Sequence, residues 1–547
     1  MRRPSVRRKN LALLLVAALA AACGGGGGDM SSPSTPPSQP PPSQPPPSGT
    51  PQPTDIPTYK YDAARSGANL SESVLTTANV NSGSFGLLRM LRVDGHVDAQ
   101  PLYLSGLMVA GAKHNVVFVV TENDSAYAFD ADSGATLWHV SLLAGGESPS
   151  DAVDSCGQIS PTIGVTATPV IDRSAGRMYL VAMSKDAAAN YYQRLHALDL
   201  TSGAELLGGP VLITATFPTH GGPMAFDARQ YAERAALLLS QGTLYLSFTS
   251  HCDTRPYSGW VLAYSAATLA QSAAFNAAPN SGGAGPAIWM AGGGPAADSA
   301  GNVYLLTANG AFETSLSGGF PSGGDYGNCF LKLSGSTLTV SDYFTMHDTV
   351  AQSSADEDLG SGGILLLPDL TDSGNTTQHL AVGAGKDGNL YVVSRDAMGK
   401  FNPSSNNIWQ ELEGVLAGGV WSTPAYFNHT VYYGPSGGAL RAFPISAAKL
   451  APGSATSTAF AYPGTSPVVS ANGTSNGIVW AHEQGNPAVL HAYDASDLSR
   501  ELYNSSQAAN GRDQFGAGNK FIAPAVADGK VFVGTQTAVA VFGLLGQ

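Results

Sequence analysis

The chain has 547 residues, and only 12% of them are Asp, Glu, Lys or Arg, about half the usual share of roughly 25%. Its net charge is −13, and Lys and Arg are not clustered beyond the first nine residues, which excludes nucleic acid as a partner. No Gly-X-Y period, heptad run or second long apolar stretch is present, so collagen, a coiled coil and a polytopic membrane protein are also excluded.

Residues 1–22 have the pattern of a secretory signal peptide. A basic segment precedes an apolar stretch, 11–22, that is too short to span a bilayer. The sequence Leu19-Ala-Ala-Ala-Cys23 resembles a bacterial lipobox, which implies that the mature protein is joined to the lipid membrane through Cys23. Because Gly24 follows the cysteine where inner-membrane lipoproteins typically carry Asp, the resemblance implies the outer membrane or the periplasmic side of the cell envelope. An ordinary signal that is cleaved nearby is the alternative.

Residues 23–58 predict a disordered tether. A run of five glycines is followed by twelve prolines between Pro33 and Pro57, interleaved with Ser, Gln and Thr. Such a segment cannot build a core, and Pro-rich chain extends by about 3.1 Å per residue as polyproline II. We therefore expect the folded domain, residues 59–547, to stand away from the lipid surface.

A repeat covers that domain. The sequence around Ala126-Tyr-Ala-Phe-Asp130 recurs, and two alternating apolar runs precede each copy, which predicts antiparallel hairpins. The third residues of the copies are Ala128, Ala197, Ala263, Lys332, Val392, Ala442, Ala492 and Ala540. Four short strands per unit at this spacing are typical of a β-propeller blade. We predict an all-β, eight-bladed propeller of four-stranded antiparallel blades, with seven blades as the alternative because the fourth and fifth copies are degenerate.

The ring is expected to close through both ends of the domain. The final unit, residues 523–545, supplies only three strands before the chain ends. Residues 85–93 precede the first complete blade and form an alternating apolar strand without a partner of their own. Pairing this strand with the last blade removes the exposed edges that an open stack of blades would leave.

The repeat also carries a family resemblance. The phrase from Ala126 to Trp138 resembles the repeat of PQQ-dependent quinoprotein dehydrogenases and of their cofactor-free propeller relatives. Residues 61–69, 99–103, 356–361 and 385–391 are similar to segments of a bacterial group of PQQ-like propeller proteins. The resemblance implies the propeller fold for residues 60–547, but propellers of this type serve as enzymes, sensors and assembly scaffolds.

In a propeller, two kinds of loop lie on the same face of the ring: loops that enter the innermost strand of a blade, and loops that link its second and third strands. This face is the usual ligand face. Most of the chemically unusual residues fall in such loops. They are His96, Asp98, Glu122, Asp124, Arg229, His251, Trp289, Asp325, Asp356, Asp358, Lys386, Trp421 and Lys520.

A PQQ site needs an aromatic floor for the quinone, a cation at its carbonyls, and a divalent ion beside a carboxylate base. Trp289 or Trp421 fits the floor, Lys386 the cation, and Asp356 with Asp358 the catalytic carboxylates, with PQQ and Ca²⁺ as the cofactors; the metal ligands are not identified. The alternative interpretation is structural: the Trp side chains plug the channel, Lys386 caps a hairpin, and the two acids are solvated turn residues.

The cysteines predict one disulfide. Cys156 and Cys252 fall in same-face loops of neighbouring blades, and an exported protein permits a bridge between them, which leaves Cys329 unpaired. The adjacent Cys-Cys pair of the enzyme family and the Cys-x-x-Cys-His of haem attachment are absent from the sequence.

Two functional hypotheses follow. The first is an exported, lipid-anchored propeller that binds a small molecule or an envelope protein at its loop face without chemistry of its own. The resemblance implies this role through related outer-membrane assembly lipoproteins. The second is a quinoprotein oxidoreductase with PQQ and Ca²⁺ that acts on an alcohol or a sugar.

Overall fold

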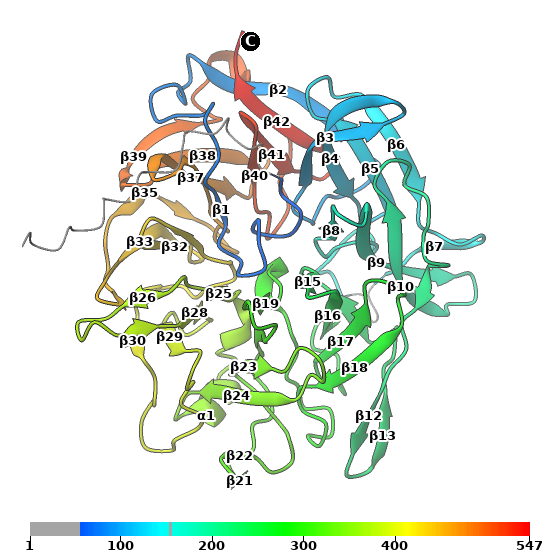
Figure 1. Ribbon diagram of the computed structural model, residues 1–547, viewed down its shortest axis with the longest axis vertical. Helices are drawn as coiled ribbons and strands as arrows, with labels where there is room; N and C mark the ends of the chain where they lie inside the picture. Colours follow the sequence, from blue (N-terminus) through cyan, green and yellow to red (C-terminus); the bar gives the residue numbers. More distant parts are fainter. Residues whose placement is uncertain (1–54, 152–155, 547) are drawn as a thin grey trace, which may run out of the picture. The chain divides into compact units, whose positions relative to one another are not determined.

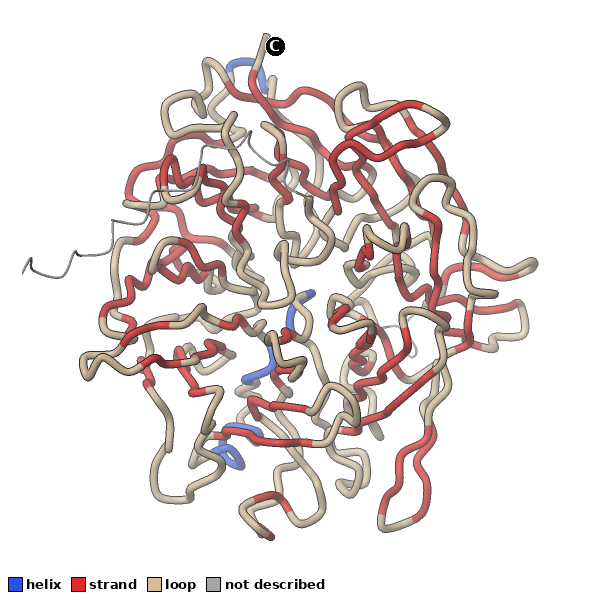
Figure 2. The backbone as a smooth tube through the Cα atoms, viewed as in Figure 1, coloured by secondary structure: helices blue, strands red, loops and turns tan. Residues whose placement is uncertain are grey.

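The computed structural model of the protein describes residues 55–151 and 156–546, so the signal peptide, Cys23 and most of the tether lie outside the described residues. Eight sheets of four or five strands form a ring around a central channel (Figure 1). Strands and loops make up nearly all of the described chain, and helices are confined to short turns (Figure 2). The prediction of eight blades is confirmed, and the alternative of seven is excluded.

The first four blades follow one another along the chain from residue 102 to residue 345. Their strands are β3 (Leu102–Val109), β4 (Ala112–Val120), β5 (Ser125–Asp130) and β6 (Thr136–Ser141); β7 (Glu147–Pro149), β8 (Val170–Asp172), β9 (Arg177–Asp186), β10 (Tyr191–Asp199) and β11 (Val211–Leu212); β14 (Tyr231–Glu233), β15 (Leu238–Ser240), β16 (Thr243–Ser250), β17 (Trp260–Ser265) and β18 (Gln271–Asn276); β19 (Ala296–Ala297), β20 (Val303–Leu306), β23 (Cys329–Leu333) and β24 (Val340–Thr345).

The last four blades complete the ring. Their strands are β25 (Leu365–Leu366), β28 (Leu380–Ala384), β29 (Leu390–Ser394) and β30 (Gln410–Leu412); β31 (Ala425–Phe427), β32 (Thr430–Tyr433), β33 (Gly438–Ser446), β34 (Lys449–Leu450) and β35 (Ala455–Phe460); β1 (Ala68–Asn69), β36 (Val468–Asn472), β37 (Ser475–Glu483), β38 (Val489–Asp494) and β39 (Asp497–Asn504); β2 (Phe85–Arg92), β40 (Ala525–Ala527), β41 (Lys530–Gly534) and β42 (Ala538–Leu544).

Short elements decorate this ring. Three two-stranded hairpins and four helical turns interrupt the loops. They are β12 (Thr216–Thr219) with β13 (Gly222–Ala225), β21 (Leu316–Ser317) with β22 (Phe320–Pro321), β26 (Leu370–Thr371) with β27 (Thr377–Gln378), α1 (Thr349–Ser354), η2 (Met290–Gly292), η3 (Leu359–Ser361) and η4 (Ala509–Gly511). No helix in the described residues is both long and apolar enough to cross a membrane.

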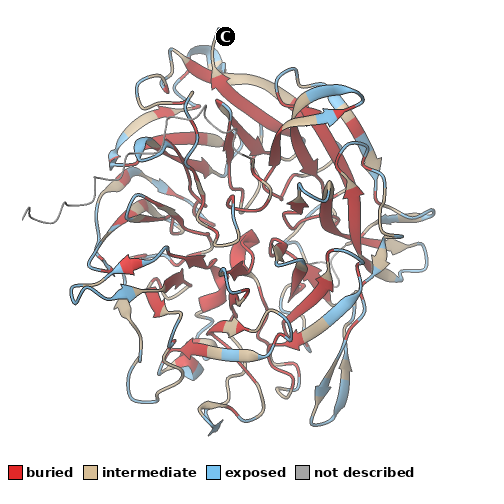
Figure 3. Ribbon diagram, viewed as in Figure 1, coloured by how far each residue is buried: buried red, intermediate tan, exposed pale blue. Residues whose placement is uncertain are grey.

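The sequence repeat is the third strand of each blade. Its marker residue lies in β5 of the first blade as Ala128 and in β42 of the last as Ala540, and the degenerate copies at Lys332 and Val392 lie in β23 and β29. Figure 3 shows that burial is concentrated toward the channel, whereas exposed residues lie mostly on outer strands and loops. The repeat therefore marks the strand that packs against both neighbouring blades.

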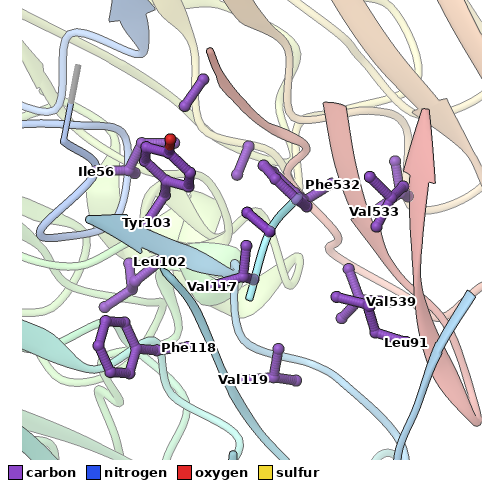
Figure 4. Packing of buried hydrophobic residues seen from close by; sticks show 14 of the residues in the cluster. Ile56, Leu91, Leu102, Tyr103, Val117, Phe118, Val119, Phe532, Val533 and Val539 are labelled. Carbon is purple, nitrogen blue, oxygen red and sulfur yellow. The ribbon is translucent and has the colours of Figure 1, made fainter. Parts of the chain in front are cut away.

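Ring closure follows the predicted scheme. Strand β2 pairs antiparallel with β42, and the register runs from Phe85 opposite Leu544 to Arg92 opposite Ala538. The blades on either side of this closure share one apolar cluster, in which the rings of Tyr103 and Phe532 lie 6.0 Å apart (Figure 4). Strand β2 therefore completes the last blade by backbone pairing, and side-chain packing joins that blade to the first.

The segment just before the first blade fills the channel. The sequence analysis assigns Ile56 to the tether, but this side chain is fully buried and its backbone pairs with Tyr103. Further along, the Lys60 and Arg65 side chains are also completely buried. Residues 56–67, which we call the plug, thus belong to the folded domain.

The two buried basic side chains of the plug bind backbone carbonyls at the starts of innermost strands. Burial lowers the pKa of Lys60 well below its usual value. The Lys60 ammonium donates hydrogen bonds to the carbonyls of Thr423 (3.1 Å) and Pro424 (3.3 Å), and it also contacts the carbonyl of Pro467. These carbonyls immediately precede β31 and β36, where the absent N–H of proline removes no ladder bond.

Arg65 acts in the same way on the other side of the ring. Its guanidinium donates to the carbonyls of Pro295 (3.0 Å), Leu237 (3.1 Å) and Tyr59 (3.0 Å). Burial lowers the pKa of Arg65 to about 10, so the side chain stays charged at neutral pH. Since buried carbonyls without a partner are costly, the plug satisfies groups that the propeller alone leaves open.

We expect Arg65→Met to lower the free energy of unfolding by about 3 kcal/mol, because each buried carbonyl left unpaired costs about 1–3 kcal/mol. Arg500→Met is the matched control, since its side chain is 60% exposed and bonded to Asp494, and exposed pairs contribute less than about 1 kcal/mol. Urea denaturation followed by circular dichroism measures both. Equal losses in the two variants would show that the plug does not hold the ring.

Candidate functional site

The loops predicted to share the ligand face converge on one pocket with a volume of about 120 Å³. Its lining comes from six of the eight blades and includes residues of the loops 156–167, 250–257, 356–363 and 513–522. The loops that enter the innermost strands or link the second and third strands were predicted to share one face, and this prediction located the pocket. No single sequence motif identified it.

Four of the five predicted cofactor and catalytic residues line this pocket, namely Trp289, Trp421, Lys386 and Asp358. The fifth, Asp356, does not line it, and its side chain is 74% exposed. The structure thus brings together the predicted aromatic rings, one cation and one carboxylate, but it places the second carboxylate at the surface.

Asp358 and Lys386 form a buried ion pair. The Lys386 ammonium lies 2.7 Å from one Asp358 oxygen, and the other oxygen accepts a 2.6 Å hydrogen bond from the Asn309 backbone N–H. Burial raises the pKa of Asp358, and Lys386 opposes that shift. Burial alone would lower the pKa of Lys386, but Asp358 and Asp356 reverse the effect and raise it.

Lys386 also reaches the exposed carboxylate, whose oxygen lies 2.9 Å from its ammonium. Close backbone packing holds this arrangement in place. A Cβ at Gly385 would lie 2.1 Å from the Asp358 carbonyl oxygen, and one at Gly419 would lie 2.8 Å from that of Lys386. Because these positions have no Cβ, the loops pack closely enough for the Lys386 ammonium to contact both carboxylates.

Two further cations line the pocket, and sequence reasoning found only one of them. Lys520 was among the unusual loop residues, whereas Arg234 lies beside strand β14 and carried no signal. The Arg234 side chain lies over the Phe521 ring, 5.1 Å from its centroid, and Lys520 lies 6.0 Å from the same centroid. Burial lowers the pKa of Lys520, and the charge of Arg234 lowers it further.

Neither of these cations has an ion-pair partner within residues 55–151 and 156–546. Arg234 donates to the Thr166 carbonyl at 3.1 Å, and Lys520 donates to the Gln158 carbonyl at 2.7 Å. Both bonds are to uncharged groups. The positive charge on this side of the pocket is therefore not neutralised by a direct contact.

Acidic residues behind Lys520 neutralise it only in part. Burial raises the pKa of Glu122 far above its usual value, and the Asp98 charge raises it further, so Glu122 is uncharged at neutral pH. His96 is a titratable neighbour of Glu122, and its Nδ1 lies 3.3 Å from a Glu122 oxygen. Asp98 accepts a hydrogen bond from Asn519, and its attraction for Lys520 opposes the lowering of the lysine pKa.

Aromatic and aliphatic side chains complete the pocket. Tyr462 is exposed and meets the Trp421 ring edge to face, with centroids 5.5 Å apart. Ile159 and Ile163 add aliphatic surface. Sequence analysis missed Tyr462 because it lies in a loop without other unusual residues.

Cys156 and Cys252 form a disulfide in the structure, with their Cα atoms 5.7 Å apart. Cys156 lines the pocket, so the bridge joins loops of the second and third blades at its edge. Cys329 is free and buried, and burial raises the pKa of its thiol. An unreactive structural role for Cys329 follows from this burial.

The residues do not fit a quinone with a divalent metal. The two predicted catalytic carboxylates already share the Lys386 ammonium, and no cluster of three or more His, Cys, Asp or Glu suited to a metal occurs among the described residues. The pocket is also small, since sites for larger organic ligands usually measure about 300–1,000 Å³.

The sequence matches no family model, and it matches no curated protein. The fold does match solved structures. A quinohemoprotein alcohol dehydrogenase from Comamonas testosteroni shares 14% identity at a TM-score of 0.60, over 90% of this chain and 81% of that one. The corresponding enzyme ADHIIG from Pseudomonas putida HK5 shares 14% at 0.61, over 91% and 81%.

A europium-containing methanol dehydrogenase shares 12% identity at a TM-score of 0.57, over 90% of this chain and 98% of that one. At such low identity the likeness concerns the fold. The resemblance that the repeat predicts is confirmed at that level: the chain has the eight-bladed propeller of quinoprotein dehydrogenases.

We expect Lys386→Met to lower the free energy of unfolding at pH 7 by about 3 kcal/mol, because it leaves Asp358 buried and unpaired. Without the lysine the pKa of Asp358 rises further, so the carboxyl takes up a proton more readily as the pH falls and the loss is smaller at pH 4 than at pH 7. Adding Asp358→Asn should restore most of the stability at pH 7. Equal losses at pH 4 and pH 7 in urea denaturation would contradict this account.

Proposed function

We propose that this protein binds a small molecule in the loop-face pocket and performs no chemistry on it. The observation that carries the proposal is the contact of Lys386 with both Asp356 and Asp358. A base or a metal ligand needs a carboxylate that is free to bind a proton or an ion, and these carboxylates are engaged by an ammonium group.

The alternative is a PQQ- and Ca²⁺-dependent oxidoreductase that acts on an alcohol or a sugar. The fold likeness to quinohemoprotein alcohol dehydrogenases and to a methanol dehydrogenase supports it. Trp289 and Trp421 line the pocket and suit the floor that such a cofactor needs. The volume of the pocket and the paired carboxylates favour the binding function over this alternative.

Titration of the metal-free protein with PQQ and Ca²⁺ separates the two functions. We expect no change in quinone absorbance and no dye reduction with a panel of alcohols and sugars. Dye reduction that requires both PQQ and Ca²⁺ and is lost in Asp358→Asn would overturn the binding function. A substitution at the distant Lys400, Lys400→Met, serves as the matched control because that lysine is not part of the pocket lining.

The location of this binding function is part of the proposal. We propose that Cys23 anchors the protein to the lipid of the outer membrane or of the periplasmic side of the cell envelope. We expect Cys23→Ser to move the protein from the membrane pellet to the soluble fraction after cell fractionation, because the acyl chains are then absent. Retention of Cys23→Ser in the pellet would rule out this anchor.

A further inference from the structure

We propose that the pocket binds a one-ring aromatic carboxylate, an inference that rests on the proposed small-molecule binding function. Three features of the pocket carry it: two cations without a charged partner, a set of aromatic walls, and a small volume. Each feature restricts the ligand in a different way.

The cations require an anion. The Arg234 and Lys520 side chains both lie near the Phe521 ring, and their hydrogen bonds go only to backbone carbonyls among the described residues. The Arg234 side chain is 6% exposed, so its charge is held away from bulk water. A guanidinium presents a planar fork that matches a carboxylate, and a nearby ammonium adds a point charge.

The acids in the pocket do not pair with these two cations. Asp358 is paired with Lys386 at 2.7 Å, and Asp253 accepts a 3.0 Å hydrogen bond from the Tyr257 hydroxyl and forms no ion pair with Arg234 or Lys520. His251 adds no charge at neutral pH, because burial lowers its pKa. The overall charge of −13 makes this local excess of positive charge unusual for the chain.

The walls require an apolar ring. Trp289, Trp421, Tyr462 and Phe521 line the pocket, together with Ile159. Aromatic side chains favour ring partners in stacked or edge-to-face geometry, which inorganic phosphate or a short aliphatic acid cannot supply. A ligand with one charged end and one aromatic end therefore fits the lining better than either kind of anion.

The volume limits the ligand to one ring. A cavity of about 150 Å³ in an engineered protein holds benzene, so a pocket of about 120 Å³ suits a ligand with a single ring. Fused polycyclic acids exceed this size.

Isothermal titration calorimetry of the full chain tests the inference with four probes: benzoate, benzyl alcohol, cyclohexanecarboxylate and inorganic phosphate. Benzoate should bind at least about 10-fold more tightly than the other three, because benzyl alcohol lacks the charge and the two other anions lack the flat ring. Equal affinity for benzoate and benzyl alcohol, or tighter binding of phosphate, would overturn the ligand class.

Variants assign the binding to the pocket. Lys520→Met should weaken benzoate binding about 10-fold or more, because it removes one of the two charges. Lys400→Met is the matched control: Lys400 also lies over an aromatic ring, 3.9 Å from the Phe320 centroid, but outside the pocket, and benzoate affinity should stay unchanged. Phe521→Leu should weaken benzoate more than it weakens cyclohexanecarboxylate.

The outcomes separate the two proposals. Unchanged benzoate affinity in Lys520→Met would overturn the assignment of the carboxylate to this cation. No benzoate binding, together with no dye reduction in the presence of PQQ and Ca²⁺, would overturn the ligand class alone. Dye reduction that requires PQQ and Ca²⁺ would instead overturn the binding function on which the inference rests.

Discussion

The ring depends on two buried basic side chains, Lys60 and Arg65, that bind carbonyl groups at the starts of its innermost strands. Proline precedes three of these strands, at Pro295, Pro424 and Pro467, and Leu237 precedes the fourth. Both side chains belong to the plug, so this one short segment contacts blades that are far apart in sequence. The closed ring in turn holds the loops that line the pocket.

The architecture followed from the sequence because a repeated strand is a local signal. The third strand of each blade keeps its apolar alternation even in the degenerate copies at Lys332 and Val392, so eight units were visible. The partnership of residues 85–93 with the last blade could be predicted because an unpaired edge is costly. These arguments need only periodicity and the count of strands.

The site was predicted only in part because its chemistry depends on distances between loops. The sequence placed Lys386 and Asp358 on the same face, but it did not show that the lysine also contacts Asp356. Arg234 was not predicted as a pocket residue because it precedes a continuous apolar run, a pattern that indicates the end of a strand. The plug was assigned partly to the tether because the prolines before Ile56 continue the composition of the preceding segment.

Charge is distributed in the protein so that the acidic surface and the pocket differ in sign. The chain carries −13 overall, yet burial raises the pKa of Glu122 and Lys386 pairs with Asp358, whereas Arg234 and Lys520 line the pocket without an ion-pair partner among the described residues. Burial thus decides which of the loop charges a ligand meets. Residue composition alone would suggest a site for cations.

The pairing of β2 with β42 has a consequence for how the polypeptide reaches its native state. Strand β2 is synthesised early, but its partner β42 is synthesised late, and the eighth blade cannot form until both are present. The ring therefore cannot close on a partly synthesised chain. Until then β2 presents open hydrogen-bonding groups, which are prone to aggregation. A chain of this design would benefit from a holding chaperone until its synthesis is complete.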